Sequence, residues 1–497
     1  MTEIVNWIES RYKLFVAALT ALYFFPAVTS DTLYRDDNAR AVVDIYLWIT
    51  GGRPIADIVN AIFTLSGTTL NFSGSFLQLL ALFCVVISII RTLSHLRGIS
   101  NLPLTLPVTS LFLSIFFIQN ISYSFDSFSM SLAMLIASVA YCSGSGTGFR
   151  HSTKAVLLLF VAAGLYQPML NVFLGLAALE ITLSALSGRS FLHAMKSLGL
   201  RALQYLGGCL LYLSVVLALG IRPENGQSQH ISVSSLPEEI WLRIGRIVHF
   251  VFEGMAVHAG VFHFMTMGAT VLATVAICYM VLKGKLRIGG GVLILVAYGI
   301  AAFSIFGFLI GFEAVSLDYR IFPTSGVFLS ISIIVISAAY RDAALIASLP
   351  LYASVLVSFQ SFAMLASQQE LDRIVMWQAA SELAKLDLAD RRVRVFGATP
   401  IAQTNGFEVE KNRFFAELVR PASNSQAEAI LLQHGILQVA PIMFSGARLD
   451  FVADRKSQFC AESLLLSENG YFQIREFEDS YFVILSGKSL LDCHSPN

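Results

Sequence analysis

The chain has 497 residues, of which 56% are hydrophobic and only 13% are charged, and its mean hydropathy is +0.69. Soluble globular proteins carry about a quarter charged residues, so this composition excludes an ordinary soluble protein and indicates one embedded in a membrane. Basic and acidic residues balance at 33 each and no basic run occurs, which argues against nucleic acid as the main partner.

Apolar runs predict about eleven membrane-spanning helices, because a helix needs roughly 20 mostly apolar residues to cross a bilayer. They centre on residues 13–29, 75–90, 102–119, 128–142, 154–166, 169–186, 203–220, 261–282, 290–311, 324–339 and 343–364. The first has no small-residue cleavage site after it, so we expect it to be retained. The fifth and sixth form either two short helices meeting at Tyr166-Gln167-Pro168 or one kinked helix.

The charge pattern orients these helices. If the fifth and sixth are separate, the connections on the N-terminal side of the membrane hold most of the lysines and arginines of the spanning region. Acidic residues collect on the opposite side. Because cytoplasmic loops carry an excess of Lys and Arg, this pattern predicts a cytoplasmic N-terminus and an outer C-terminus.

After the last apolar run the chain changes character. Residues 366–497 predict a small α/β domain on the outer side, with a helix at 368–387 and strands within 391–398, 438–444 and 471–485. The fold class is therefore a mainly α polytopic membrane protein, residues 1–365, followed by this domain. Cys460 and Cys493 in the domain are either a disulfide or two free buried thiols. The six cysteines form no CxxC or Cys/His cluster, which disfavours a metal centre.

The first outer loop contains "YRDDNARAVVDIY", in which Asp36 and Asp37 lie between two arginines. As a helix, this segment would place Asp37, Arg40 and Asp44 on one face and most apolar residues off it. That pattern predicts a helix lying in the membrane interface, with its charges facing up and its apolar side facing down.

Later outer segments add further polar groups. Arg53 lies in "GGRPIAD", Asp126 in "NISYSFDSF", Tyr166 and Gln167 in the third outer connection, and Arg320 in "FEAVSLDYRIFP". Taken singly, an outer aspartate pair is usually a solvated turn, and an arginine at a helix end usually extends towards headgroups. Several such groups near hydrocarbon depth are functional candidates, because ionisable side chains there cost free energy.

The residue types constrain the chemistry. A carboxylate is the simplest general base for a hydroxyl nucleophile, and an arginine binds phosphate with paired hydrogen bonds. Together, just above the lipid, they suit a substrate with a lipid tail, a phosphate and a transferable group.

The segments "YRDDNARAVVDIY", "GGRPIADIV", "SYSFDSFSMSLAML" and "GLYQPMLNVF" resemble the GtrII-type glucosyltransferases, bacterial serotype-converting enzymes that decorate O-antigen. The resemblance covers roughly residues 10–365, and extends more widely to the GT-C class of membrane glycosyltransferases. Their acidic residues lie in the first and second outer loops, where Asp36, Asp37 and Asp126 lie in this sequence.

The resemblance implies an inverting transfer of glucose from undecaprenyl-phosphate-glucose to an O-antigen hydroxyl, on the periplasmic side of the bacterial inner membrane. Companion proteins would make this donor in the cytoplasm and flip it outwards, and neither a metal nor another cofactor is expected. An aspartate of the pair would be the base. The implied substrate-binding residues are Arg320, Arg40 and Arg53 for phosphate, with Asp126, Tyr123, Tyr166 and Gln167 around the sugar and acceptor.

The sequence does not decide between the two aspartates. Asp36 is four residues before Arg40, and an ion pair at that spacing would make it a poorer base, so we favour Asp37 as the base and Asp36 as its neighbour. Three other functions stay open: a transporter or flippase, an O-antigen ligase or other polyprenyl-linked glycan enzyme, and a non-catalytic anchoring protein. A transporter should carry ionisable groups near the midplane, whereas here they lie at the outer edge.

Overall fold

The computed structural model describes residues 2–42, 48–49, 51–64, 74–146, 148–221, 236–255, 261–307, 318–389, 391–439 and 447–486. It is mainly helical with one small sheet, which confirms the predicted fold class. The chain divides into two compact units. The bundle unit contains Met1–Thr29, Leu47–Phe63 and Ser75–Gln360, and the sheet unit contains Ser30–Tyr46, Thr64–Gly74 and Ser361–Asn497.

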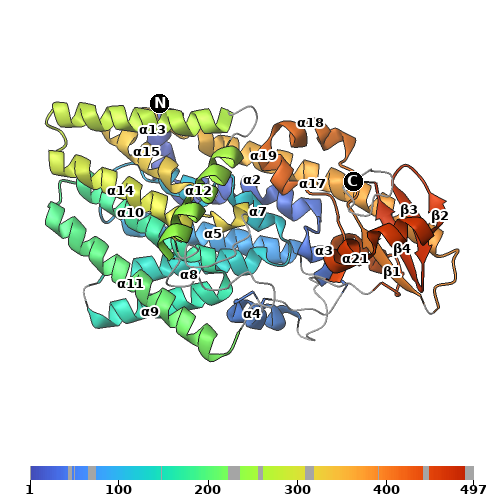
Figure 1. Ribbon diagram of the computed structural model, residues 1–497. Coiled ribbons are helices and arrows are strands. Elements are labelled where there is room, and N and C mark those ends of the chain that lie inside the picture. The colour runs from blue at the N-terminus through green and yellow to red at the C-terminus, as the bar shows by residue number, and fades with distance from the viewer. Residues whose placement is uncertain are drawn as a thin grey trace. The chain divides into compact units, whose positions relative to one another are not determined.

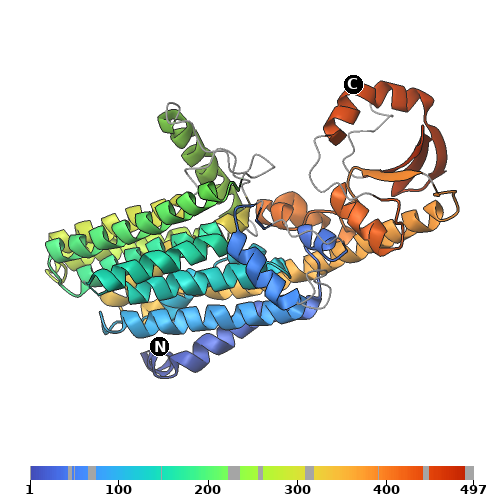
Figure 2. The ribbon, with the colours of Figure 1, turned by 90° about the horizontal axis from the view of Figure 1, so that it is seen from below.

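The bundle unit consists of long apolar helices that run side by side (Figures 1 and 2). Of the described helices, seven are long and apolar enough to cross a membrane, and three shorter ones are also apolar. α10 is the central helix: nearly all its side chains are buried, and it contacts α8, α11, α14 and α15. The helices are α1 (Thr2–Ser10), α2 (Tyr12–Ser30), α4 (Pro54–Thr64), α5 (Gly74–Leu96), α6 (Thr105–Phe112), α7 (Phe117–Ser122), α8 (Ser127–Ser143), α9 (Phe149–Leu165), η1 (Gln167–Met169), α10 (Leu170–Leu186), α11 (Phe191–Ala218), α12 (Leu236–Met255), α13 (Val261–Leu282), α14 (Ile288–Phe306), η3 (Tyr319–Ile321), α15 (Val327–Ala339), α16 (Ala343–Ala347) and α17 (Leu349–Leu383).

Two predicted segments show where local sequence decides the helix boundaries. The run 154–186 forms two helices, because Tyr166 adopts an extended backbone between α9 and η1. The single span predicted over 102–119 is wrong, since the chain breaks between α6 and α7. The carbonyl of Ser114 in the break accepts a hydrogen bond from the Tyr23 hydroxyl at 2.7 Å. Irregular backbone is tolerated inside a membrane bundle when buried side chains satisfy it in this way.

An ion pair joins α10 and α11 inside the bundle unit. Arg201 on α11 and Glu180 on α10 approach to 3.1 Å, and both are largely buried. Tyr141 and Ser197 donate further hydrogen bonds to the Glu180 carboxylate, at 2.8 and 2.7 Å. The Glu180 carboxylate and the Arg201 guanidinium are both hydrogen-bonded to neighbouring groups. We therefore interpret this ion pair as structural, holding α8, α10 and α11 together.

The sheet unit begins inside α17, which continues without a break from the apolar run into the polar residues expected as a separate helix. Its four strands have the order β1-β4-β3-β2, with β1 parallel to β4 and the other pairs antiparallel. Strands appear within 391–398 and 471–485 as predicted. At 438–444 only a bridge from Val439 to Val393 is described, and the rest lies outside the described residues. The elements are β1 (Arg392–Phe396), α18 (Gln403–Lys411), α19 (Arg413–Leu418), α20 (Ser425–Gln433), α21 (Ala447–Glu462), β2 (Leu464–Glu468), β3 (Phe472–Phe477) and β4 (Ser480–Leu485).

An apolar core and a disulfide stabilise the sheet unit. Apolar side chains of α17, α20 and the strands form its core, among them Val375, Val395 and Val483. Cys460 on α21 is disulfide-bonded, so the alternative of a free thiol at this position is wrong, while Cys493 lies outside the described residues.

The segment with the aspartate pair folds with the sheet unit. Its short helix α3 (Asp36–Arg40) packs on α20, and the carbonyl of Asn38 accepts a hydrogen bond from Gln433 at 3.3 Å. The prediction of an interfacial helix with upward charges is therefore wrong for the described part, because Asp37 and Arg40 are buried. Asp44, the third residue of the expected face, lies outside the described residues.

Candidate functional site

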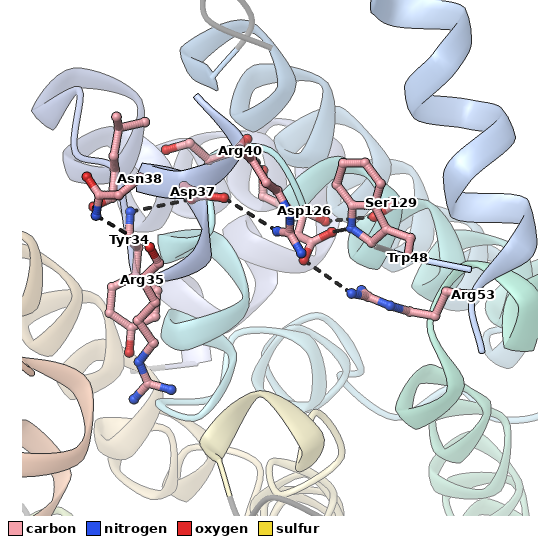
Figure 3. Close-up of polar contacts among 12 residues, drawn as sticks. Tyr34, Arg35, Asp37, Asn38, Arg40, Trp48, Arg53, Asp126 and Ser129 are labelled. Atoms are coloured by element: carbon pink, nitrogen blue, oxygen red, sulfur yellow. Dashed lines mark hydrogen bonds and ion pairs between the residues drawn. The ribbon is translucent and has the colours of Figure 1, made fainter. Parts of the chain in front are cut away.

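Helix α3 is held by reciprocal hydrogen bonds at its start. The Asp37 N–H donates to the Tyr34 carbonyl at 3.0 Å, and the Asp37 carboxylate accepts from the Tyr34 N–H at 3.4 Å (Figure 3). Between them, Arg35 has a φ of 49°, a conformation that is costly for a residue other than glycine. The Arg35 guanidinium donates to the Glu417 carbonyl at 2.6 Å, which ties this turn to α19.

The two adjacent aspartates have different surroundings. Asp37 is fully buried, and Arg40 lies 3.7 Å from its carboxylate (Figure 3). Asp36 is half-buried and, within the described part of the chain, its carboxylate has no hydrogen bond or ion pair. The ion pair expected for Asp36 with Arg40 is thus made by Asp37, which lies three residues before Arg40 on the same helix.

A second polar group lies in the bundle unit around Asp126. This aspartate is fully buried just before α8 and accepts a hydrogen bond from the Trp48 indole N–H (Figure 3). Its other carboxylate oxygen lies 3.5 Å from the Arg53 guanidinium, whose side chain is 11% exposed. Asp126 therefore fixes Arg53 in a site with little access to water, where a second anion would still find the remaining guanidinium N–H groups.

The turn before Arg53 is also fixed. Gln167 donates hydrogen bonds to the carbonyls of Gly51 and Gly52, at 3.0 and 3.1 Å, and to the Tyr212 hydroxyl at 2.9 Å. Gly52 has a φ of 74°, and a Cβ there would lie 2.9 Å from the Tyr212 hydroxyl. Only glycine suits this turn, so Gln167 acts here as a support for Arg53.

Arg320 is the second arginine of the bundle group. Its guanidinium lies 3.5 Å from the Asp318 carboxylate and 4.7 Å from the centre of the Tyr123 ring, and its side chain is 20% exposed. The Arg320 backbone is held by three side chains: its N–H donates to Gln119, and its carbonyl accepts from Asn120 and Tyr166. The predicted residue Tyr123 is thus a platform for a guanidinium.

Tyr166 joins the two arginines. The Arg53 guanidinium lies 5.5 Å from the Tyr166 ring centre, and the Tyr166 hydroxyl donates to the Arg320 carbonyl at 3.0 Å. The structure therefore brings together six of the predicted residues in the bundle unit, which are Asp126, Arg53, Tyr123, Tyr166, Gln167 and Arg320. It groups the other three, Asp36, Asp37 and Arg40, in the sheet unit.

Sequence inspection missed several members of the bundle group. Trp48 and Tyr212 carry no pattern that distinguishes them from other interfacial aromatic residues. Gln119 and Asn120 did carry a signal, because two consecutive amides interrupt the apolar run "LFLSIFFIQNIS". Among the described residues, no His, Cys, Asp and Glu side chains are grouped as metal ligands.

An apolar cavity of about 320 Å³ lies in the bundle unit. Helix α12, which runs at a steep angle to α13 and α14 (Figures 1 and 2), lines one side of it. Phe250, on the same helix, lies 4.9 Å from the ring of Tyr319 and 5.8 Å from that of Phe322, the residues flanking Arg320 and Ile321. The lining residues are Ile244, Val248, Val251, Phe252, Thr266, Met267, Thr270, Ala302, Ile305, Phe306, Ser325 and Phe328.

Comparisons with known proteins bear on these groups. The family model described as "Glucosyl transferase GtrII" matches residues 25–337, which include both aspartates of α3, Asp126 and Arg320. A Salmonella phage P22 protein described as "Uncharacterized 55.3 kDa protein in gtrB 5'region" is 24% identical over 173 residues, 33% of this chain and 34% of the phage protein. The match thus spans about a third of that relative's length. No solved structure matches the chain.

Proposed function

Because the chain belongs to the GtrII glucosyltransferase family, we propose that it transfers glucose from undecaprenyl-phosphate-glucose to a hydroxyl of an O-antigen chain. The observation that carries the donor class is that α12 lines an apolar cavity and, through Phe250, also packs on Tyr319, the residue before Arg320. The donor phosphate needs a cationic group such as the Arg320 guanidinium, and the isoprenoid chain needs an apolar cavity.

Charge explains the choice of a phosphate ligand. Arg53 lies 3.5 Å from the Asp126 carboxylate, and Arg320 lies 3.5 Å from the Asp318 carboxylate. A guanidinium has five N–H donors, and in Arg53 one buried guanidinium nitrogen has no hydrogen-bond partner among the described residues, so this arginine could bind a phosphate oxygen as well as Asp126. In a largely buried site, such donors would stabilise the charge that develops on the lipid phosphate as it leaves.

The cavity suits the apolar part of the donor. Its size is at the lower end of the range for ligand pockets, which is about 300–1,000 Å³, and its lining is almost entirely aliphatic and aromatic. It would hold the first few isoprene units behind the phosphate, while the rest of the chain lies in the bilayer.

We propose Asp36 as the general base, in place of Asp37. Its carboxylate is half-buried and unpaired among the described residues, whereas Asp37 is fully buried against Arg40. The acceptor hydroxyl would give its proton to Asp36 while its oxygen forms a bond to the anomeric carbon of glucose. The bond from that carbon to the phosphate oxygen breaks, its electron pair leaves with the lipid phosphate, and the configuration inverts. The ion pair of Asp37 with Arg40 would stabilise the conformation of α3.

Location and partners follow from the same proposal. A disulfide at Cys460 is typical of an oxidising compartment, which supports a periplasmic sheet unit and a cytoplasmic N-terminus in the bacterial inner membrane. The donor would come from a companion synthase and flippase. A donor with a single phosphate, esterified to both lipid and sugar, has no diphosphate for a cation to neutralise, so neither metal nor other cofactor enters the proposed reaction.

The test is mass spectrometry of lipopolysaccharide from cells that supply donor and acceptor, with and without this chain. We expect one added hexose per repeat, its loss in Asp36→Asn, and its retention in Asp31→Asn, a control that changes an exposed aspartate of the same segment. Purified protein in detergent should also transfer glucose, which separates catalysis from transport because no membrane then divides donor from acceptor. An unchanged glycan in cells that contain the protein would refute the proposal.

A further inference from the structure

Arg320 lies where regular secondary structure provides little support. It belongs to η3, a 3-10 helix of only three residues. The turn's own backbone hydrogen bonds run from Ile321 to Asp318 and from Phe322 to Tyr319, so neither uses the N–H or carbonyl of Arg320.

Two consecutive amide side chains of α7 bind that backbone directly. The Gln119 side-chain oxygen accepts the Arg320 N–H at 2.8 Å, and the Asn120 side-chain nitrogen donates to the Arg320 carbonyl at 3.1 Å. The Tyr166 hydroxyl donates to the same carbonyl at 3.0 Å. Both peptide groups that flank the Arg320 Cα are therefore fixed by side chains from other elements.

The hydrogen bonds of these two amides are energetically important because both side chains are buried. Gln119 and Asn120 are both completely buried, and a buried amide without hydrogen bonds is strongly unfavourable. They lie on a helix of only six residues, and the next residue after this helix, Tyr123, forms the ring platform under the Arg320 guanidinium. One short segment, residues 119–123, thus holds Arg320 at its backbone and at its side chain.

We propose that Gln119 and Asn120 are positioning residues, which hold Arg320 so that its guanidinium meets the anionic group of the substrate. This inference rests on the proposed function, in which Arg320 binds the donor phosphate. Removing either amide would let η3 shift and lower the affinity for the donor, without changing any group that touches the acceptor.

The test measures KM separately for donor and acceptor, with purified full-length variants, undecaprenyl-phosphate-glucose and lipopolysaccharide. Gln119→Leu removes the acceptor of the Arg320 N–H, and we expect the donor KM to rise about three- to tenfold with the acceptor KM unchanged. Tyr166→Phe removes one bond to the Arg320 carbonyl, creates little cavity, and should raise the donor KM in the same direction.

Gln204→Leu is the matched control. Gln204 is also a buried glutamine, but it donates to the Gly144 carbonyl beside the Arg201 group. Its loss should lower thermal stability and leave the donor KM unchanged. Equal effects of Gln119→Leu and Gln204→Leu on the donor KM would overturn the proposal, as would an unchanged donor KM in both Gln119→Leu and Tyr166→Phe.

Arg320→Ala separates this inference from the proposed function. A raised donor KM in Arg320→Ala, with none in the Gln119 and Tyr166 variants, would refute positioning and leave the role of Arg320 in place. An unchanged donor KM in Arg320→Ala would refute the phosphate-binding role, and the positioning role with it.

Discussion

Replacing Asp126 by asparagine tests the charge balance of the bundle group. The substitution keeps the side-chain shape and an oxygen that can accept the Trp48 indole N–H, but it removes the negative charge beside Arg53. The positive charge would then remain in a site where the Asp126 side chain is fully buried and that of Arg53 is only 11% exposed.

The geometry gives the size of the effect. At the 3.5 Å separation of Arg53 and Asp126, two unit charges attract by roughly 5 kcal/mol at an effective dielectric constant of about 20. Breaking a buried pair by removing one partner typically costs about 3–5 kcal/mol. Because Arg53 keeps some contact with water, we expect the lower end, about 3 kcal/mol of destabilisation.

Thermal unfolding of the purified protein in detergent, at one fixed heating rate, measures this loss. At about 2 °C per kcal/mol for a large chain, Asp126→Asn should lower Tm by roughly 6 °C. The double variant Arg53→Met with Asp126→Asn removes both charges and should recover at least half of that decrease. Both variants should lose glucose transfer, since each lacks a group of the proposed site.

Two results would refute the reasoning. An unchanged Tm in Asp126→Asn would mean that the ion pair contributes no net stability. A double variant as unstable as Asp126→Asn would mean that an unpaired Arg53 charge is not the cause of the loss.

Three further outcomes are expected. Gly52→Ala should destabilise the protein by about 1–2 kcal/mol and reduce hexose incorporation, because φ is 74° and an added Cβ would lie 2.9 Å from a hydroxyl. Gly199→Ala, where φ is not positive and an added Cβ would meet no neighbouring side chain in the described part of the chain, is the comparison, and equal activity of the two would contradict this explanation. Glu180→Gln leaves Arg201 buried without its carboxylate partner, and removing one partner of a buried ion pair costs about 3–5 kcal/mol of stability. The yield of monodisperse protein should therefore fall. A normal yield on size-exclusion chromatography would count against a structural role for this ion pair. Cys460→Ser should destabilise the sheet unit by about 2–5 kcal/mol, which would be measured as faster proteolysis of that unit. A variant as resistant to proteolysis as the unsubstituted protein would argue against a stabilising disulfide.

Local sequence patterns predicted much of this fold. Hydropathy placed a helix in each apolar run, and the composition of residues 471–485 indicated strand structure, where β3 and β4 form. The Tyr166-Gln167-Pro168 stretch was recognised as a possible boundary between two helices, which it is. These features depend on neighbours along the chain, so composition and periodicity are enough to detect them.

The partners of the functional side chains could not be predicted in this way. Asp37 and Arg40 are buried because α3, in the segment with the aspartate pair, packs on α20, nearly 400 residues further along the chain. Considered alone, that segment has the pattern of an amphipathic surface helix. Packing against another element decided that Asp37 is fully buried and that Asp36 is only half-buried.

The sequence by itself determined a membrane bundle followed by an α/β domain. It also identified charged residues near the membrane as functional candidates, because an ionisable side chain placed there costs free energy. Only the tertiary structure decided that Gln119 and Asn120 hold Arg320, about 200 residues away, and that a break between α6 and α7 is satisfied by Tyr23. The physical reason is that a buried polar group must find its partner wherever the fold brings one, and sequence distance does not enter that requirement.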